Sequence, residues 1–272
     1  MDVITCLERQ QIKKKHTVKI IIIDDQSDDG TWEALNERKY TRPVEILRTQ
    51  PRNTWSAAIP RNVGAKSADG DTECFLFLDS DILLPPDRIQ AYINNWREDP
   101  DPKRVIIGPY HYIKDRDHRI DVTDEEWYTR DVQGYAQDIR WQSFLDHPKD
   151  EKNAGWGWAL ACFGGSIMIP RDLFFKAGMY DEYCTAGVED GDFGITLWET
   201  GAVFSLNASL LGWHNWHEIT AKRTENLTAM VEYLDRKHRT DIVKQTGEVY
   251  RTWGIEWADE RWSGKKKKGK KK

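Results

Sequence analysis

Two pairs of aspartates each follow an apolar run that has the length of a β-strand. Asp24 and Asp25 come directly after four consecutive isoleucines, and Asp79 and Asp81 follow the run Cys74–Leu78. A strand holds the residues at its carboxyl end rigidly, and open α/β sheets bind their ligands at that edge. Carboxylate oxygens suit Mg²⁺ or Mn²⁺ and leave positions open for substrate phosphates. The second pair therefore predicts a divalent-cation site, and the first pair predicts hydrogen bonds to a base or a ribose.

Simpler interpretations of these aspartates stay open. An Asp-x-Asp sequence after a strand can close a turn and cap the next helix without binding any ion. The segment Ser27–Asp29 is expected to cap the next helix in any case, but this does not explain Asp24 and Asp25. A third acidic segment, Glu189–Asp192, begins another predicted helix, where the helix dipole favours acidic residues even without catalysis.

The elements that must position these residues alternate along the chain. Short β-rich runs are predicted at 18–23, 44–47, 74–78, 104–110, 163–169 and 203–206. Helices are predicted at 31–38, 60–68, 85–96, 170–177, 189–200 and 219–238. This alternation is typical of an α/β fold with a mostly parallel sheet and crossover helices. The isoleucine run fits a strand that is buried on both faces, and the polar, Trp-rich residues 111–160 predict a partly helical insertion.

Charge and composition narrow the classes of protein. The formal charge of the 272-residue chain is −5, and removing the seven lysines after Gly264 leaves −12. An acidic body with a short basic tail predicts no nucleic-acid partner. The tail is interpreted as a solvated end or a cloning artefact, with weak contact to an anionic membrane surface as the alternative.

Location is predicted from what the sequence lacks. The apolar runs fall short of the roughly 20 residues that span a bilayer, and the first residues do not resemble a signal peptide. The four cysteines are far apart and form no CxxC pair, so a reducing compartment is expected. We therefore predict a cytoplasmic protein without a transmembrane segment.

Five segments, taken in order, resemble the motifs of one family. The family's motifs read VVDDxSxDGT, ARNxG, FLDxD, GG…R…GxFDE and ED; the matching segments are Ile20–Thr31, Arg61–Ala65, Phe77–Asp81, Gly164–Glu182 and Glu189–Asp192. Each match is weak alone, but the set resembles the family 2 glycosyltransferases of the GT-A fold over roughly residues 5–217. The resemblance implies a transferase that moves a sugar from a nucleotide-sugar donor, with UDP as the favoured nucleotide.

The resemblance implies a role for each donor-side residue. Asp24 or Asp25 would contact the nucleoside, and Arg61 would lie near the nucleotide. Asp81 would bind the divalent metal directly, whereas Asp79 would be shared between metal and donor. Family members often add a histidine from beyond the ED helix, so His214 is the third predicted metal ligand, with His217 as the second choice.

The acceptor side is predicted in the same way. Asp190 would act as general base for the acceptor hydroxyl, with Glu189 as its competitor, and direct displacement would invert the anomeric carbon. Trp158, Gly164 and Gly165 would lie against a glycan acceptor. For the tryptophan, ordinary packing is an equal alternative, and the glycines could serve only a tight bend.

In one respect the chain departs from the family pattern. The family opens with a strand that touches the nucleotide, whereas this sequence begins in the helix after it, so the first family strand is expected to be missing. The predicted organisation is a GT-A domain over 1–240, with a nucleotide-binding half at 1–110 and an acceptor-binding half at 111–240. Residues 241–272 form a C-terminal extension.

Two other functions stay open. A non-catalytic nucleotide- or glycan-binding module would fit the missing strand and the many tryptophans. A nucleotidyltransferase also uses paired carboxylates, but it usually carries a Gly-rich basic loop after its first strand, which is not seen here.

Overall fold

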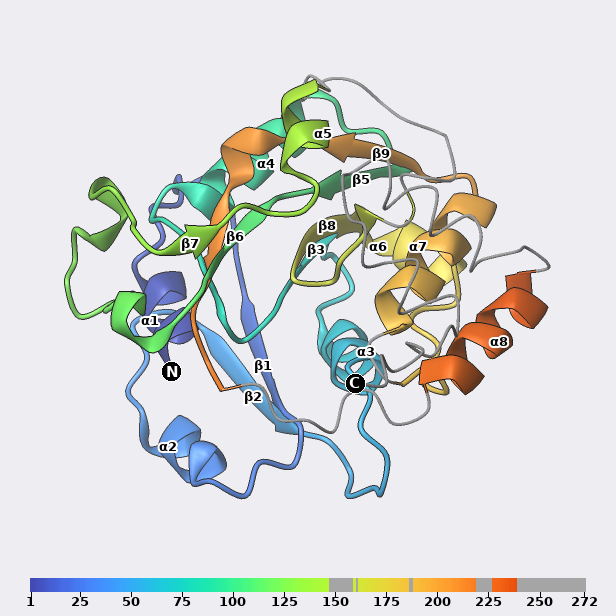
Figure 1. Ribbon diagram of the computed structural model, residues 1–272, viewed down its shortest axis with the longest axis horizontal. Coiled ribbons are helices and arrows are strands. Elements are labelled where there is room, and N and C mark those ends of the chain that lie inside the picture. Colours follow the sequence, from blue (N-terminus) through green and yellow to red (C-terminus); the bar gives the residue numbers. More distant parts are fainter. Residues whose placement is uncertain (147–158, 160, 186–187, 219–226, 239–272) are drawn as a thin grey trace, which may run out of the picture.

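A computed structural model describes residues 1–146, 159, 161–185, 188–218 and 227–238. These residues form an α/β fold with three small sheets, shown in Figure 1. The predicted α/β class is confirmed. The predicted C-terminal extension and its lysines lie outside the described residues.

The first sheet holds only two strands, β1 (Ile20–Asp24) and β2 (Val44–Arg48), which run parallel and are connected through α2 (Thr31–Glu37). The prediction that the isoleucine strand is buried on both faces is wrong. In β1 only the end residues Ile20 and Asp24 are buried, and the three isoleucines between them are half-buried. The faces of a strand are covered by what packs above and below the sheet; α3 (Ala58–Ser67) packs beside Ile21 and Ile23 but leaves both half-buried. Among the described residues, β2 is the one strand that pairs with β1.

The central sheet has the strand order β3-β8-β5-β9. Its strands are β3 (Cys74–Leu78), β8 (Ser166–Pro170), β5 (Arg104–Ile107) and β9 (Val203–Leu206). Strand β8 runs antiparallel to both β3 and β5, whereas β5 and β9 are parallel. The central sheet is therefore mixed rather than mostly parallel.

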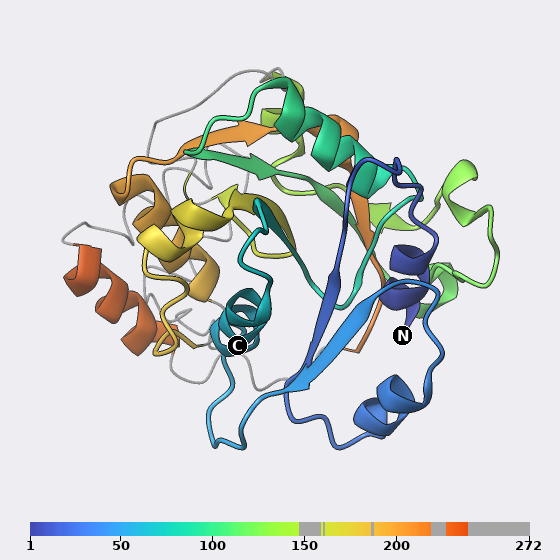
Figure 2. The same cartoon turned by 180° about the vertical axis from the view of Figure 1, so that it is seen from behind.

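Helices cover both faces of this central sheet. Neighbouring side chains of a strand point to opposite sides, so each face presents its own set of apolar side chains to a helix. Ile106 and Met168 pack against Tyr92 and Trp96 of α4 (Arg88–Glu98), the helix in the foreground of Figure 2, where the fold is seen from behind. The alternate residues of the same strands pack against α6 (Arg171–Lys176) and α7 (Glu189–Glu199). The sheet is thereby fixed between two apolar layers.

The third sheet has the order β4-β10-β6-β7 and contains β4 (Ile82–Leu83), β10 (Gly212–His214), β6 (Tyr110–Ile113) and β7 (Tyr135–Ala136). The single strand predicted over 104–110 is a wrong expectation, because Gly108 and Pro109 separate β5 from β6. Proline cannot donate to a ladder, and a Cβ on Gly108 would lie 1.9 Å from the Tyr92 hydroxyl. The chain therefore crosses from one sheet to the next at this point.

The remaining elements complete the fold around these sheets. They are α1 (Asp2–Glu8), α3 (Ala58–Ser67), η1 (Arg116–His118), η2 (Trp127–Thr129), α5 (Trp141–Asp146), η4 (Ala208–Leu210) and α8 (Leu227–His238). Helix α3 begins two residues before the predicted Pro60, which keeps this proline in the first turn. The predicted insertion over 111–160 contributes β6, β7 and α5, and residues 147–158 and 160 lie outside the described part.

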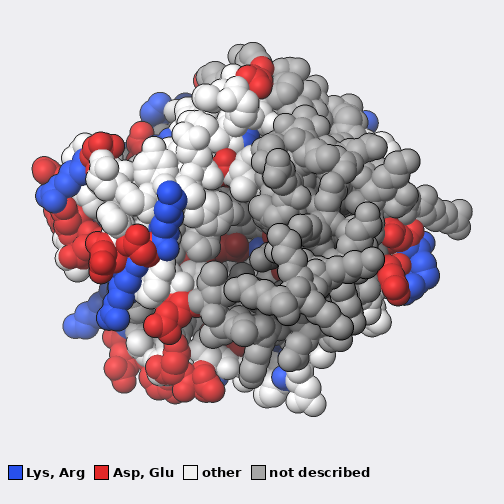
Figure 3. Space-filling view, viewed as in Figure 1, with Lys and Arg blue, Asp and Glu red and all other residues white. Residues whose placement is uncertain are grey.

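Two features of the composition can be followed in the structure, the acidic side chains and the four cysteines. Figure 3 shows acidic side chains around α2 and around the segment 115–131. All four cysteines are free thiols. Within the described ranges, no helix has the length and apolarity needed to cross a bilayer.

Candidate active site

Asp81 meets two histidines at the junction of β4 and β10. The antiparallel pairing places His214 opposite Ile82, so that β10 runs past the turn after β3. Oδ2 of Asp81 lies 3.4 Å from Nε2 of His214 and 3.2 Å from Nε2 of His217. The structure thus brings together Asp81, His214 and the second-choice ligand His217 as a group of potential metal-ligating atoms.

The donor set and its spacing fit a divalent cation. Ligands at right angles on one such ion lie about 3 Å apart when each is about 2.1 Å from it. Oδ1 of Asp81 is buried and has no hydrogen-bond partner in the described part of the chain. Burial raises the pKa of Asp81, while the two histidines oppose that shift. A buried oxygen without a partner is costly, and a bound cation would compensate for it.

Asp79 lies apart from this group and is bound to Arg61. Nη2 of Arg61 donates to Oδ1 of Asp79 over 2.8 Å, and Nη1 donates to Oδ1 of Asp190 over 2.7 Å. One guanidinium on α3 therefore joins the carboxylate after β3 to the first turn of α7. The structure brings the predicted residues Arg61, Asp79 and Asp190 together.

The two neighbouring acids of α7 differ in exposure. Glu189 is buried at 3% exposure, and its Oε2 has no hydrogen-bond partner among the described residues. Burial, aided by the charge of Asp190, raises the pKa of Glu189 to about 7. The side chain of Asp190 is 21% exposed, so a substrate hydroxyl can reach it. Burial also raises the pKa of Asp190, against the charge of Arg61.

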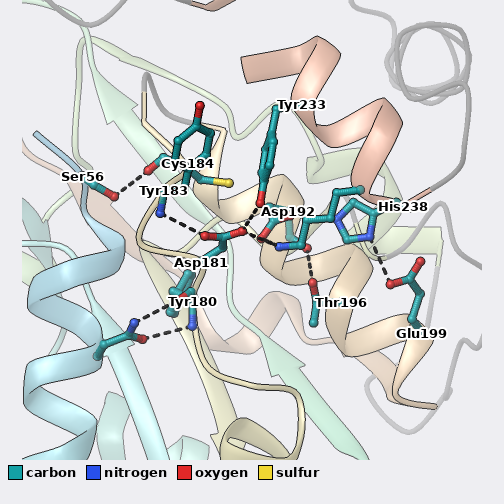
Figure 4. Close-up of polar contacts among 12 residues, drawn as sticks. Ser56, Tyr180, Asp181, Tyr183, Cys184, Asp192, Thr196, Glu199, Tyr233 and His238 are labelled. Atoms are coloured by element: carbon teal, nitrogen blue, oxygen red, sulfur yellow. Dashed lines mark hydrogen bonds and ion pairs between the residues drawn. The ribbon is translucent and has the colours of Figure 1, made fainter. Parts of the chain in front are cut away.

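Asp192, the third acid of this segment, serves the packing of α8. Its carboxylate is bound by Nζ of Lys237 over 2.8 Å and by Nε2 of His238 over 2.8 Å. Figure 4 shows Asp192 and His238 in contact, with Glu199 on the far side of the imidazole. Asp181 is held from the same helix by Tyr233 and Lys237. The carboxylate of Asp192 is therefore bound by side chains of α8, unlike those of its neighbours Glu189 and Asp190.

The first pair of aspartates also divides by role. Asp24 is buried, with Oδ2 2.8 Å from Nε of Arg48 and Oδ1 accepting from the amide of Ser27. Asp25 is partly exposed and accepts from the hydroxyl of Thr49 over 2.7 Å, while Nη2 of Arg52 lies 2.5 Å from its other oxygen. Asp24 closes the turn after β1, and Asp25 is the member of the pair that a ligand can approach.

Close packing explains the two glycines before β8. A Cβ on Gly164 would lie 2.4 Å from Oδ1 of Asp190 and 2.4 Å from Cζ of Arg61. A Cβ on Gly165 would lie 3.0 Å from the ring of Tyr110. Glycine is needed at 164 because the backbone passes directly over the ion pair. The predicted acceptor residue Trp158 lies outside the described residues.

Sequence reasoning missed several residues that support the site. The ring of Tyr112 lies 5.0 Å from that of His214 between centroids, and Tyr110 stacks on the same histidine at 6.2 Å. Arg140 is fully buried, with Nη2 2.6 Å from Oδ2 of Asp138. Arg140 also donates to the carbonyl of Ala161. Tyr110 ends the strand predicted over 104–110, whereas Tyr112, Asp138 and Arg140 fall in the stretch 111–160 without clear periodicity, where the sequence carried no signal for them.

Solved structures of similar shape show the fold class. The chain superposes on the crystal structure of a Staphylococcus aureus TarS fragment in complex with UDP-GlcNAc. The TM-score is 0.65 at 14% identity, covering 98% of this chain and 70% of that one. The fold is the GT-A fold.

Sequence comparisons then show the family. The model described as glycosyl transferase family 2 matches residues 2–174, so the chain belongs to that family. The chain is 23% identical to the uncharacterized glycosyltransferase YfnE of Bacillus subtilis, over 81% of this chain and 62% of that protein. It is 34% identical to the poly(ribitol-phosphate) beta-N-acetylglucosaminyltransferase TarP of S. aureus, over 37% of this chain and 29% of TarP. The chain thus spans less than two thirds of the length of these relatives.

Proposed function

We propose that this chain is a metal-dependent, inverting glycosyltransferase that moves a sugar from a UDP-sugar to an acceptor hydroxyl. The observation that carries the proposal is the convergence of two groups at the end of β3. One group is Asp81 with His214 and His217, and the other is Asp79 joined through Arg61 to Asp190. A cation site and a reachable carboxylate are the two parts that this transfer requires.

The donor side is supported by the family and by its partly exposed polar groups. TarS, which shares the fold, was crystallised with UDP-GlcNAc. Here Asp25 would accept from the uracil or the ribose, and Asp79 would take the ribose or share the cation through its free face, since its side chain is 41% exposed. A glycan or another hydroxyl compound is the proposed acceptor.

The chemistry assigned to Asp190 is proton removal. The acceptor oxygen attacks the anomeric carbon as its proton passes to a carboxylate oxygen of Asp190. The bond from the anomeric carbon to the diphosphate oxygen breaks with its electron pair, and UDP leaves. Attack opposite the leaving group inverts the anomeric centre. Glu189 is less suited as base, because it is buried and protonated up to about pH 7.

The donor atoms favour Mn²⁺ over Mg²⁺. Asp81 would contribute an oxygen and the histidines two imidazole nitrogens, whereas Mg²⁺ takes oxygen ligands almost entirely. When bound, the ion would act as a Lewis acid for the departing diphosphate. The four free cysteines suit a reducing compartment, so we retain the cytoplasm as the expected location.

The test is transfer from UDP-sugars with Mn²⁺, with Mg²⁺ and with a chelator. We expect Mn²⁺ to saturate at a lower concentration than Mg²⁺. Asp81→Asn should reduce turnover by a factor of about 10² or more, and the exposed control Asp117→Asn should leave it unchanged. Turnover that survives both the chelator and Asp81→Asn would contradict the proposal. Binding of UDP without any transfer would instead support a non-catalytic module.

A further inference from the structure

Arg61 makes contacts that nucleotide binding alone does not require. Its side chain is 11% exposed, and each terminal nitrogen is used by a different carboxylate. Its Cζ lies 5.1 Å from the ring centroid of Tyr180, and the backbone at Gly164 approaches so closely that a Cβ there would overlap the guanidinium. Little of this guanidinium is left for a donor molecule.

The neighbouring residue fixes this arrangement. Nδ2 of Asn62 donates to the carbonyl of Tyr180 over 2.9 Å, and the amide of Tyr180 donates back to Oδ1 of Asn62 over 3.0 Å. These two bonds hold the segment before α7 against α3. The ring of Tyr180 is thereby placed against Arg61, whose guanidinium in this orientation donates to both carboxylates.

We propose that Arg61 is a positioning residue for the base: it holds the Asp190 carboxylate ionised and aimed, and links it to Asp79 on the donor side. This role presupposes the proposed function with Asp190 as base. It goes beyond that function by assigning to Arg61 a task on the acceptor side of the reaction. Arg61 acts through Asp190 and needs no contact with substrate.

The charges around Asp190 explain why such a residue is needed. Its ionisable neighbours are Glu189 on α7, Asp79 after β3, Tyr180 before α7 and Cys162 before β8. None of these carries a positive charge, and burial already raises the pKa of Asp190. Arg61 is the cation that opposes this shift. An opposite charge this close typically lowers a carboxyl pKa by about 1–3 units.

The test compares Arg61→Met with Arg52→Met, its matched control. Arg52 also pairs with an aspartate, Asp25, but on the nucleoside side. We expect Arg61→Met to lower kcat about 10²-fold or more. In a plot of kcat against pH, the acid limb should move to higher pH by about one unit or more. UDP affinity by calorimetry should change little. Arg52→Met should weaken UDP binding and raise the donor KM, with the acid limb unmoved.

Two further variants keep the test valid if Arg61→Met folds poorly. Gly164→Ala should displace Arg61 from Asp190 and give the same upward shift of the limb. Arg61→Lys keeps the charge but cannot bridge two carboxylates as a planar fork does, so it should restore the limb in part while kcat stays low. An acid limb that stays in place in Arg61→Met and Gly164→Ala, with a raised KM or a uniform fall in kcat, overturns the proposal.

A readout that needs no turnover separates this role from the proposed function. The ¹³C-carboxyl signal of Asp190, assigned by its loss in Asp190→Asn, can be titrated in the wild-type protein and in Arg61→Met. We expect the pKa of Asp190 to rise in the variant, and an unchanged pKa would overturn the proposal even without transfer. Full transfer activity in Asp190→Asn would instead show that the proposed base is wrong.

Discussion

At the scale of single residues, three acids within four positions have three different environments. Asp190 is reachable and paired with Arg61, Glu189 is buried with a partnerless oxygen, and Asp192 is bound by α8. The helix dipole favours acids in a first turn, but it does not distinguish among the three. Their differences come from what each side chain meets, and they predict different responses to the loss of charge.

Glu189→Gln should stabilise the protein at alkaline pH. The native state keeps a proton on Glu189 up to about pH 7, whereas the unfolded chain loses it near the ordinary glutamate pKa of 4.5. The native state therefore binds more protons between these values, so wild-type stability falls as pH rises through that window. Glutamine removes this loss. Denaturant unfolding at pH 5 and pH 8 should show the variant gaining relative to wild type only at the higher pH; an equal difference at both values would contradict the prediction.

At the scale of elements, α8 is held to the domain by charged contacts along its last turns. Lys237 contacts both Asp181 and Asp192, and His238 contacts Asp192 and Glu199 through its two nitrogens. The imidazole is 1% exposed and lies between two carboxylates. These hydrogen bonds raise the pKa of His238, against its burial. The docking of α8 on α7 should therefore depend on the protonation of one histidine.

His238→Gln should destabilise the protein most at low pH. The folded pKa of His238 lies above the unfolded value, so its contribution is fully present below about pH 6.5 and is lost as pH rises through the folded pKa. We expect a loss of about 2 kcal/mol at pH 5.5, shrinking towards pH 9. Unfolding curves across this range measure it, with Arg236→Gln, an exposed change on the same helix, as control. A loss that does not vary with pH would show that His238 acts by packing alone.

At the scale of the whole molecule, the three sheets differ in how well they are supported. Strand β8 lies between two partners and is buried along its whole length, whereas the middle of β1 is only half-buried, with β2 as its single partner in the described part of the chain. A two-stranded sheet is marginally stable by itself. Helix α3 packs on β1, since a Cβ on Gly64 would lie 3.4 Å from the side chain of Ile23. The nucleoside edge near Asp25 therefore belongs to the least supported sheet.

Amide hydrogen exchange should report this difference directly. We expect the amides of β1 and β2 to exchange by local opening, well before those of β8 and β5, because exchange free energies range from near zero up to the global value. Mass spectrometry of exchanged peptides would resolve the two sheets. Equal protection of β1 and β8 would show that the first sheet opens only on global unfolding.

Local signals in the sequence determined the family, the α/β class and most of the elements. Apolar runs of strand length predicted β1, β2, β3, β8 and β9, and the motif order predicted the family. Each of these signals lies within a few neighbouring residues, where backbone preference and hydrophobic periodicity act.

The motif resemblance predicted that Asp81 and His214 share one site, but the contacts that each side chain makes were decided by the tertiary structure. Arg61 and Asp190 are 129 positions apart, and β10, a three-residue strand without a clear pattern, brings His214 to Asp81, with His217 following just after the strand. The sequence also could not show that β1 is half-buried or that Asp192 serves α8. Pairing over such separations follows from how the sheets and helices pack, and no local preference of the chain encodes it.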